Sequence, residues 1–346
     1  MAEVSRPTIS DVARAAGVSK GAVSFALNNR PGVAAETRER ILAAARELGW
    51  TPSSRARALS VSRAFAVGLV LARKPETLRA DPFFPSFIAG VEQELAAHDY
   101  ALLLQVVGEQ QHEHDSYRRL AHGGRVDGVF VTDLLVDDPR PALLAELGLP
   151  AVVVGPALPD TFFPAVGVDD KPGIAAAVQH LIDLGHTRVA HVAGPAAYVH
   201  GTSRKRAWAD TLAAAGLAEG PCVETDFSAE SGAAATRTLL DLVEPPTAIV
   251  YANDVMAIAG LAVAHGRGVD VPGELSVVGY EDTELAAHVQ PSLTSVATDV
   301  VAWGGAAARR LLGLIAGHEE GSQSKEPELA PPTLVVRGST APPVRR

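Results

Sequence analysis

The chain has 346 residues, of which 47% are hydrophobic, and a formal net charge of −10 at pH 7. This length is sufficient for two or three domains with buried cores. The single cysteine, Cys222, excludes an internal disulfide framework. No basic and apolar leader follows Met1, and no apolar run reaches the roughly 18 residues of a membrane span, so we expect a cytoplasmic protein.

The charge is distributed unevenly along the chain. Residues 1–63 hold ten Lys and Arg against five Asp and Glu, a formal charge of +5, which leaves −15 for the remainder. A basic segment on an acidic body attracts phosphate locally while the body repels it. The distribution indicates a nucleic-acid-binding segment, although a solvated helical face would carry the same charge.

The first 50 residues are expected to form three short helices. Ser10 is a suitable N-cap for the first, over 11–16, and Gly17 suits the left-handed position after it. Ser19 is the expected N-cap of the second, over 20–28. The apolar spacing turns the following side chains inward on the second helix and on a third, over 35–48: Val23, Ala26, Leu27, Ile41, Leu42, Ala45 and Leu48. Two helices joined by a glycine-containing turn are typical of a helix-turn-helix motif.

The outward face of the second helix carries side chains that suit DNA. Lys20 and Ser24 could reach phosphates or base edges, and Phe25 could contact a thymine methyl group. The DNA-binding residues assigned to this region are Ser10, Ser19, Lys20, Gly21, Ala22, Ser24, Phe25 and Asn28. A small helical bundle used for protein contacts would show a similar pattern.

A helix-capable run over 53–59 follows Pro52. It is shorter than the ~12–15 residues that an isolated helix needs in water, so we expect it to fold only against another surface. Arg55 and Arg57 could contact phosphates, and Leu59 could act as an apolar wedge in a minor groove. An ordinary interdomain linker is the alternative interpretation.

Three stretches of this region, "TISDVARAAGVSKGAVSFALN", "TRERILAAARELGW" and "TPSSRARALS", resemble the DNA-binding region of the LacI/GalR (lactose-repressor) family of bacterial transcriptional regulators. The resemblance implies a homodimer whose recognition helices read two half-sites of a pseudo-palindromic, double-stranded operator. It also implies that paired hinge helices place Leu59, with Ala56 beside it, at the operator centre. This chain differs from many relatives in three residues: Phe25 in place of Arg, Ser53 in place of Asn, and Ala34 in place of a Ser that caps the third helix.

From Ala64 on, short apolar runs alternate with amphipathic stretches, as in parallel sheets covered by helices. One series of strands is expected at 65–71, 100–105, 126–133 and 150–155, and a second at 164–169, 189–194, 247–254 and 275–282. Two successive series imply two doubly wound α/β lobes. The family resemblance implies the fold of periplasmic sugar-binding proteins, with three crossovers between the lobes.

These elements predict the domain organisation. We expect a helix-turn-helix headpiece over 1–52, a hinge helix and linker over 53–63, and an effector-binding and dimerisation domain over 64–346. Lobe 1 of that domain is expected at about 64–163 and 297–326, and lobe 2 at about 164–296 and 327–340. No C-terminal leucine heptad is visible, which favours a dimer over a tetramer.

Polar side chains collect where the expected strands end, and ligands of such sheets bind at the carboxyl ends of strands. Asn253 and Glu281 end two strands, while Arg204 and Phe227 lie in the segments between them. Carboxylate, amide, guanidinium and aromatic groups together suit a polyhydroxylated ligand, although each alone is more often a helix cap or a salt bridge.

The family resemblance extends over "GHTRVAHVAGP", "YANDVMAIAGL" and "SVVGYEDTELAAHVQPSLTSVATD". It implies an effector pocket lined by Arg204, Phe227, Asn253 and Glu281, with Phe83 of "DPFF" from the other lobe. The implied function is a repressor whose operator affinity is controlled by a sugar or sugar derivative. A corepressor of the nucleobase type is the alternative, and neither induction nor corepression is favoured.

Enzymatic signatures are missing from the sequence. It contains no G-x-G-x-x-G, Walker, G-x-S-x-G or CxxC motif, and we expect no catalytic residue, cofactor or metal. The run "HEHD" at 112–115 with His122 could bind a metal, but a solvated helix start is the favoured interpretation. A secreted sugar-binding protein would lack the basic headpiece, and a sugar-processing enzyme would need an acid/base pair.

The Leu59→Ala variant tests the hinge assignment. Loss of the apolar wedge should lower operator affinity by at most a few kcal/mol and reduce bending of the DNA. Gel-shift titrations and a circular-permutation bending assay measure both quantities. Bending equal to that of the wild type would contradict a wedge at this residue.

Overall fold

A computed structural model describes residues 7–27, 31–50, 63–108, 110–157, 162–317 and 329–344. The chain divides into two compact units, Met1–Phe65 and Ala66–Arg346, which are described separately. The predicted DNA contacts Asn28, Arg55, Ala56, Arg57 and Leu59 lie outside the described residues, as does most of the expected hinge.

The first unit contains three helices, α1 (Ile9–Ala15), α2 (Lys20–Leu27) and α3 (Ala35–Glu47). Each is too short to be stable alone in water, so burial of a shared apolar core has to hold them together. Val12, Val23 and Ile41 are fully buried at the centre of this core. The helix-turn-helix prediction is confirmed.

The helix starts differ from the prediction in one case. α1 begins at Ile9, so its N-cap is Thr8 and the prediction of Ser10 as the cap is wrong. The Thr8 N–H donates to the Asp11 carboxylate at 2.9 Å, which fixes the start one turn ahead of the acidic residue. Ser19 does cap α2, because its hydroxyl accepts from the Ala22 N–H at 3.2 Å.

The inward faces also differ in part. Val23, Ala26, Ile41 and Ala45 are buried as predicted, and Leu27 packs partly against the core. The predicted inward positions Leu42 and Leu48 are wrong, because each is 36% exposed. Small side chains at Ala44 and Ala45, one turn from Ile41, fill the core instead.

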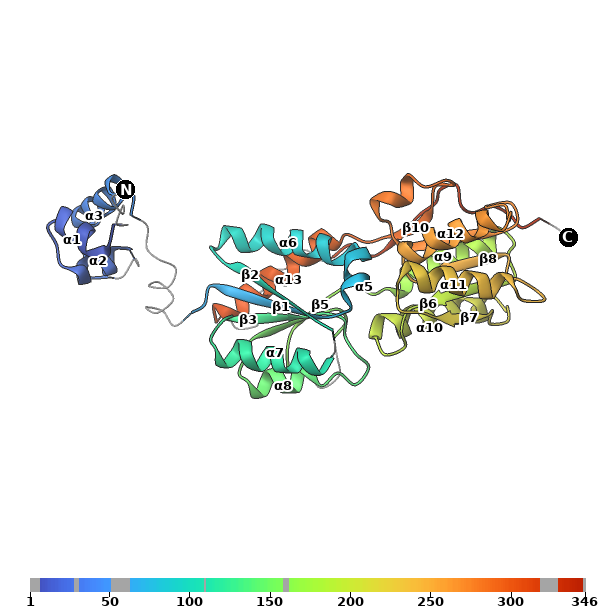
Figure 1. Ribbon diagram of the computed structural model, residues 1–346, viewed down its shortest axis with the longest axis horizontal. Helices are drawn as coiled ribbons and strands as arrows, with labels where there is room; N and C mark the ends of the chain where they lie inside the picture. The colour runs from blue at the N-terminus through green and yellow to red at the C-terminus, as the bar shows by residue number, and fades with distance from the viewer. Residues whose placement is uncertain are drawn as a thin grey trace, which may run out of the picture. The chain divides into compact units, whose positions relative to one another are not determined.

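The second unit contains two parallel-rich sheets, one in each lobe (Figure 1). The lobe 1 sheet has the order β2-β1-β3-β4-β5 and consists of β1 (Ala66–Ala72), β2 (Ala101–Val107), β3 (Gly128–Val131), β4 (Ala151–Val154) and β5 (Ala165–Val166). Its helices are α5 (Pro75–Ala80), α6 (Phe83–Ala97), α7 (Gln110–His122), α8 (Arg140–Glu146) and α13 (Val300–Ile315).

Alternation along β1 explains how helices cover both faces of this sheet. Val67, Leu69 and Leu71 belong to the core formed with α6 and α13. Val70 points the other way and packs into the core formed with α7 and α8. The nearly continuous apolar run that predicted this strand therefore reflects burial on both sides.

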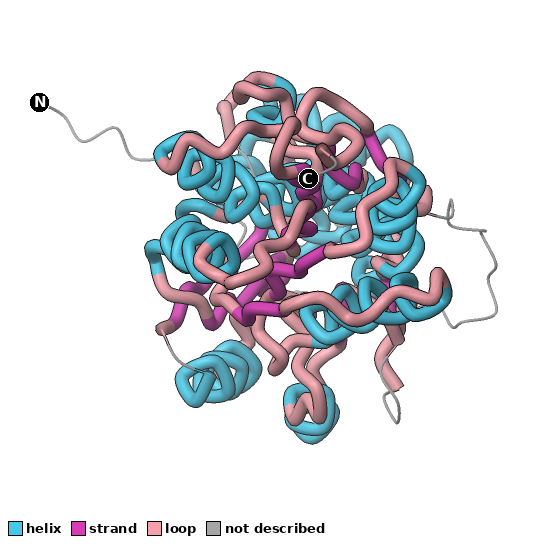
Figure 2. The backbone as a smooth tube through the Cα atoms, turned by 90° about the vertical axis from the view of Figure 1, so that its right-hand side faces the viewer, coloured by secondary structure: helices cyan, strands magenta, loops and turns pink. Residues whose placement is uncertain are grey.

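The lobe 2 sheet has the order β11-β10-β9-β8-β6-β7, with β11 antiparallel to β10. Its strands are β6 (Val189–Ala193), β7 (Cys222–Glu224), β8 (Ala248–Tyr251), β9 (Ser276–Glu281), β10 (Thr294–Ala297) and β11 (Thr333–Val335). The helices of this lobe are α9 (Lys171–Asp183), α10 (Val199–Ala214), α11 (Ala229–Leu240), α12 (Asp254–Gly266) and the 3-10 helix η1 (Glu284–Ala287). Figure 2 shows strands enclosed between helices, as expected for a doubly wound lobe.

The segment over 164–169 was expected to open the second series of strands, and this expectation is wrong. Ala165 and Val166 instead pair with Val153 and Val154 of β4 and complete the lobe 1 sheet. The free edge of β4 explains this, since the Gly155 N–H donates to the Val166 carbonyl at 2.9 Å. The chain crosses to lobe 2 after β5, returns to lobe 1 after β10 and adds β11 to lobe 2.

The Ala34→Ser variant should stabilise the first unit by roughly 0.5–1 kcal/mol. Ala34 is the N-cap of α3, with extended backbone angles and no side-chain acceptor for the first amides of that helix. Thermal unfolding of the full chain, followed by amide exchange in the first unit, measures the effect. Ala35→Ser is the matched control, because Ala35 lies inside α3 and its side chain is not at the cap. Equal effects of both changes would contradict the capping explanation.

Candidate functional site

A cavity with about 690 Å³ of empty space, part of it open to solvent, lies between the two lobes of the second unit. Five residues of its walls lie at the end of a strand or within two residues of it: Arg73 after β1, Asp133 after β3, Gly155 after β4, Asn253 after β8, and Glu281 at the end of β9. The cavity therefore lies at the carboxyl ends of parallel strands, where the sheet architecture favours ligand binding.

All five predicted effector contacts line this cavity. They are Phe83, Arg204, Phe227, Asn253 and Glu281. Phe83 comes from lobe 1 and packs edge-to-face on Trp303 with ring centroids 5.6 Å apart, while the other four come from lobe 2. The structure brings the five together, and their contact with a ligand stays a prediction.

Arg204, on α10, is held by three groups of its own lobe. Its Nε donates to Asp170 at 3.1 Å and its Nη1 to the Ala252 carbonyl at 2.7 Å, while the guanidinium lies 3.8 Å from the centroid of the Tyr280 ring. The Tyr280 hydroxyl donates to the same Asp170 carboxylate at 2.7 Å. Although burial opposes the charged form, Asp170 keeps the pKa of Arg204 above its usual value. The guanidinium is thus fixed, charged and neutralised by Asp170.

Asn253 acts as a structural connector. Its side-chain oxygen accepts from the Met256 N–H at 2.9 Å and caps α12, and its Nδ2 donates to the Phe227 carbonyl at 3.1 Å. The helix-cap interpretation therefore applies to Asn253, and the same amide also positions Phe227. Phe227 has a left-handed backbone conformation, with a φ of +67°. Its ring packs so closely on Gly194 that a methyl group on this glycine would lie 2.0 Å from the ring.

Glu281 lines the cavity with one carboxyl oxygen that lacks a hydrogen-bond partner among the described residues. Its Oε2 is buried and makes no hydrogen bond to any residue that the structure describes. Burial, reinforced by the charge of Asp81, raises the pKa of the Glu281 carboxyl well above its usual value. A carboxyl group in this state can donate as well as accept a hydrogen bond.

Sequence reasoning missed the charged group contributed by lobe 1. Arg73 donates to both oxygens of Asp133, at 2.6 and 2.7 Å, and to Asp81 at 2.7 Å. Burial works to raise the pKa of Asp133, but the paired guanidinium outweighs it and lowers that pKa. Burial raises the pKa of Asp81, which contacts Arg73 through one nitrogen only. Their place in the sequence could have identified them, because Arg73 and Asp133 lie where expected strands end, in "LVLARK" and "FVTD".

An aromatic group also borders the cavity. The rings of Tyr198, His200 and Phe227 are stacked in sequence, with centroid separations of 5.4 and 5.3 Å. Burial and the charge of Arg204 lower the pKa of His200 to about 4, so this ring is neutral at pH 7. The group offers flat apolar surface against which a sugar ring or a planar heterocycle could pack.

Three residues of the cavity wall have strained backbone conformations. Asp133, Phe227 and Glu281 have φ angles of +50°, +67° and +107°, which residues other than glycine rarely adopt. Such conformations persist only where surrounding contacts determine them, and they cluster at ligand sites. The contacts around these three residues therefore hold the cavity wall in a defined conformation.

The "HEHD" run has a different explanation from the one expected. Glu113, within α7, is buried and pairs with Arg140 at 2.8 Å, so the expectation of a fully solvated helix start is wrong. No group of three or more His, Cys, Asp or Glu side chains in the described ranges could hold a metal ion.

Among the same residues, no helix combines the length and the apolar character needed to span a membrane.

Comparison with known proteins places the chain in a family. Residues 8–53 match the bacterial regulatory proteins of the lacI family, and residues 178–340 match the periplasmic binding protein-like domain. The HTH-type transcriptional regulator CelR of Thermobifida fusca is 36% identical over 317 residues, which cover 90% of this chain and 93% of CelR. The chain belongs to the lacI family of bacterial regulatory proteins.

Solved structures agree with this assignment. The Lac repressor dimer bound to operator and the anti-inducer ONPF matches with a TM-score of 0.82 and 28% identity, over 97% of this chain and 99% of that chain. A CelR–cellobiose complex matches with a TM-score of 0.72 and 34% identity, over 96% and 100% of the two chains. As a lacI-family member the protein is a DNA-binding transcriptional regulator and not an enzyme, which confirms the predicted family, fold class and general function.

The Asp254→Asn variant tests the electrostatics beneath the cavity. Asp254 opens α12 and accepts hydrogen bonds from the Ser295 hydroxyl at 2.5 Å and the Thr283 N–H at 2.7 Å. Burial raises its pKa from 3.8 to about 6. The folded state then binds more protons than the unfolded state between these values, so the wild type loses stability as pH rises from about 4 to above 6. The single amide oxygen of asparagine can still accept from the Thr283 N–H, while its Nδ2 can donate to the Ser295 hydroxyl oxygen. The variant should remove that loss, which amounts to about 3 kcal/mol.

Urea unfolding at several pH values between 4 and 7.5 measures the difference in the free energy of unfolding between variant and wild type. The exposed Asp241, paired with Arg267 on the surface, supplies the control variant Asp241→Asn. Parallel pH profiles of Asp254→Asn and the wild type would show that Asp254 is ionised at ordinary pKa in the folded protein.

Proposed function

We propose that this regulator is a repressor whose affinity for operator DNA is controlled by a small sugar or sugar derivative bound in the cavity between the lobes. The observation that carries the proposal is the unpaired Glu281 carboxyl, which faces a cavity lined by rings and fixed polar groups. The match to the CelR–cellobiose complex supports a ligand of this class.

The charges of the cavity favour an uncharged ligand. Both arginines that line it, Arg73 and Arg204, already pair with carboxylates of the protein. A phosphate or carboxylate group on the ligand would have to displace these carboxylates or approach Glu281. Hydroxyl groups can instead donate to and accept from the Glu281 carboxyl, while apolar ring faces pack on the Phe227 side of the cavity.

A corepressor of the nucleobase type is the second candidate. The stacked rings of Tyr198, His200 and Phe227 favour it, because a planar base could extend the stack. A thermal-shift screen of the purified protein against neutral sugars, sugar phosphates and purines tests both candidates, since a ligand of the native state raises the melting temperature. We expect neutral sugars to raise it and sugar phosphates not to; a shift with purines alone would favour the second candidate.

The residues proposed to read the bases of the operator lie on α2. Lys20 and Gly21 are exposed, Phe25 is 42% exposed, and Ala22 and Ser24 are half-buried on the same helix. We assign base reading to this surface, and phosphate contacts to Ser10, Ser19 and the hinge residues Arg55 and Arg57. The Lac repressor dimer bound to operator supports a homodimer that contacts two half-sites of double-stranded DNA. Binding to operator DNA places the proposed site of action in the cytoplasm.

The Arg204→Ala variant should bind operator with nearly wild-type affinity and lose its response to the effector identified in the screen. Arg204 lines the cavity on α10 and has no part in the first unit, so its loss should affect ligand anchoring and leave DNA contacts intact. Effector can change operator affinity only by binding one arrangement of the lobes better than the other. Operator titrations with and without effector measure the response of both proteins.

Arg206→Ala is the matched control. Arg206 lies two residues along α10, is 78% exposed and pairs with Asp210 at the surface. It should respond to effector like the wild type. A wild-type midpoint and amplitude in Arg204→Ala would mean that the cavity is not the effector site.

A further inference from the structure

The loop over 133–138, between β3 and α8 of lobe 1, is hydrogen-bonded directly to lobe 2. The Val136 N–H donates to the Ala197 carbonyl at 2.9 Å, and the Val199 N–H donates to the Leu134 carbonyl at 2.8 Å. Leu135 and Tyr198 form an antiparallel bridge between these bonds. We call this pair of hydrogen bonds the interlobe ladder. Its lobe 2 side continues directly into α10, which carries His200 and Arg204 into the cavity wall.

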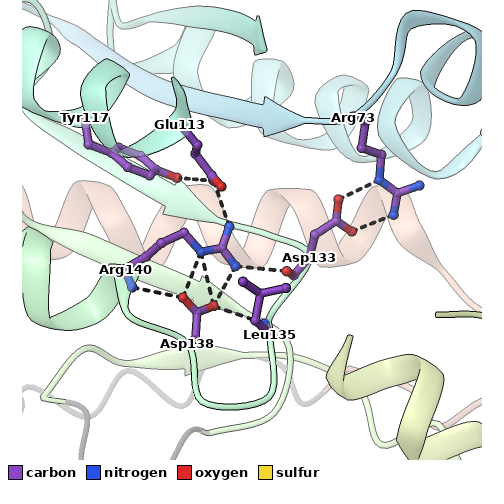
Figure 3. Close-up of polar contacts among 7 residues, drawn as sticks. All are labelled: Arg73, Glu113, Tyr117, Asp133, Leu135, Asp138 and Arg140. Carbon is purple, nitrogen blue, oxygen red and sulfur yellow. Dashed lines mark hydrogen bonds and ion pairs between the residues drawn. The ribbon is translucent and has the colours of Figure 1, made fainter. Parts of the chain in front are cut away.

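Arg140 bonds to both ends of this loop, as Figure 3 shows. Its Nη2 donates to the Asp133 carbonyl at 2.9 Å, and its Nε and Nη2 donate to the Asp138 carboxylate at 2.9 and 2.6 Å. Asp138 also accepts from the Leu135 N–H at 3.1 Å. The Arg140 guanidinium therefore bonds to both ends of the loop, at Asp133 and Asp138, and Asp138 in turn bonds to Leu135 within it.

The backbone of the loop needs such support. Asp133 and Asp137 have φ angles of +50° and +57°, which residues other than glycine adopt only when surrounding contacts determine them. The carbonyl of Asp133 is bonded to Arg140, while its side chain accepts both hydrogen bonds from Arg73 in the cavity. The same loop thus carries a cavity carboxylate on one side and the interlobe ladder on the other.

Arg140 is itself anchored by buried charge. Its side chain is 3% exposed, and its Nη1 donates at 2.8 Å to Glu113, which also accepts from the Tyr117 hydroxyl at 3.2 Å. Burial raises the pKa of Glu113 although Arg140 opposes it, and Arg140 holds the pKa of Asp138 below its usual value in spite of burial. Separating such buried partners is costly, so the cluster holds the loop in a fixed geometry.

We propose that Arg140, which does not line the cavity, is a positioning residue that presents the loop over 133–138 to lobe 2 and thereby determines how firmly the interlobe ladder is held. The planar fork of arginine suits this task because it bonds three acceptors in fixed directions. Lysine at the same position would keep the buried charge but could not bond all three acceptors in this geometry.

Amide hydrogen exchange of the full-length protein without effector tests the proposal. The Val199 N–H is informative because Val199 is the first residue of α10 and its N–H has no acceptor within the helix. Its protection reports on the bond to Leu134 across the lobes. In Arg140→Lys we expect exchange at Val199 to be at least tenfold faster, although Arg140 donates its own hydrogen bonds to Glu113, Asp133 and Asp138 and not to the interlobe ladder. Arg118→Lys, at an exposed arginine of α7, should leave exchange at Val199 unchanged.

Two further variants separate positioning from a general structural defect. Val136→Pro removes one N–H of the interlobe ladder at a half-exposed side chain and should speed exchange at Val199 while peptides around Glu113 and Tyr117 stay protected. Asp138→Asn weakens the bonds between Arg140 and the loop while it keeps Arg140, and should also speed exchange at Val199. This variant therefore replaces Arg140→Lys in the test if Arg140→Lys does not fold.

Wild-type exchange at Val199 in folded Arg140→Lys, or in Asp138→Asn, would overturn the proposal. So would exchange at Val199 in the wild type at the rate of an unstructured peptide. Because no effector is added, the outcome does not depend on whether the ligand is a sugar.

Discussion

The Arg73 guanidinium, buried between the carboxylates of Asp133 and Asp81, is the contact on which the cavity depends. A charged group in this position is tolerated only with partners, and each partner acquires a fixed place in return. Asp133 is bound through both oxygens, and its backbone adopts a left-handed conformation. Asp81 uses its second oxygen to accept from the Phe83 N–H at 2.9 Å, which fixes the start of α6. The ion pair therefore orders three separate segments of lobe 1.

The same arrangement recurs at Arg204 in lobe 2 and at Arg140 behind the cavity. Arg140 bonds to two carboxylates and the Asp133 carbonyl, and Arg204 bonds to Asp170 and the Ala252 carbonyl, so each connects segments that are distant in the sequence. In each of the three clusters the guanidinium is paired with at least one carboxylate of the protein. Glu281, by contrast, keeps an oxygen unpaired, and a ligand hydroxyl would satisfy it. This contrast between paired arginines and an unpaired acid is the physical basis for proposing an uncharged effector.

The clusters also suggest how a regulator of this family can connect ligand binding to movement. Asp133 contributes its side chain to the cavity and its carbonyl to Arg140, and the loop that follows bonds to lobe 2. A rigid loop with contacts on three sides transmits a change at one side to the other two. Packed buried clusters have few alternative arrangements, so such a change favours one of two lobe positions over a continuous series.

The sequence by itself determined the family, the three-helix headpiece, the two lobes and five of the residues that line the cavity. The headpiece and the lobes follow from helix and strand periodicity, while the five cavity residues as a set were implied by the resemblance to the family. Local patterns did not distinguish Thr8 from Ser10 as a cap, did not show that Leu42 and Leu48 are exposed, and did not show that 164–169 completes the first sheet. Only the tertiary structure decided which charges pair, because Arg73 and Asp133 are 60 residues apart and Glu113 and Arg140 are 27 apart. The strand order of the lobe 1 sheet brings such distant loops to one edge, and burial there requires each charge to find its partner.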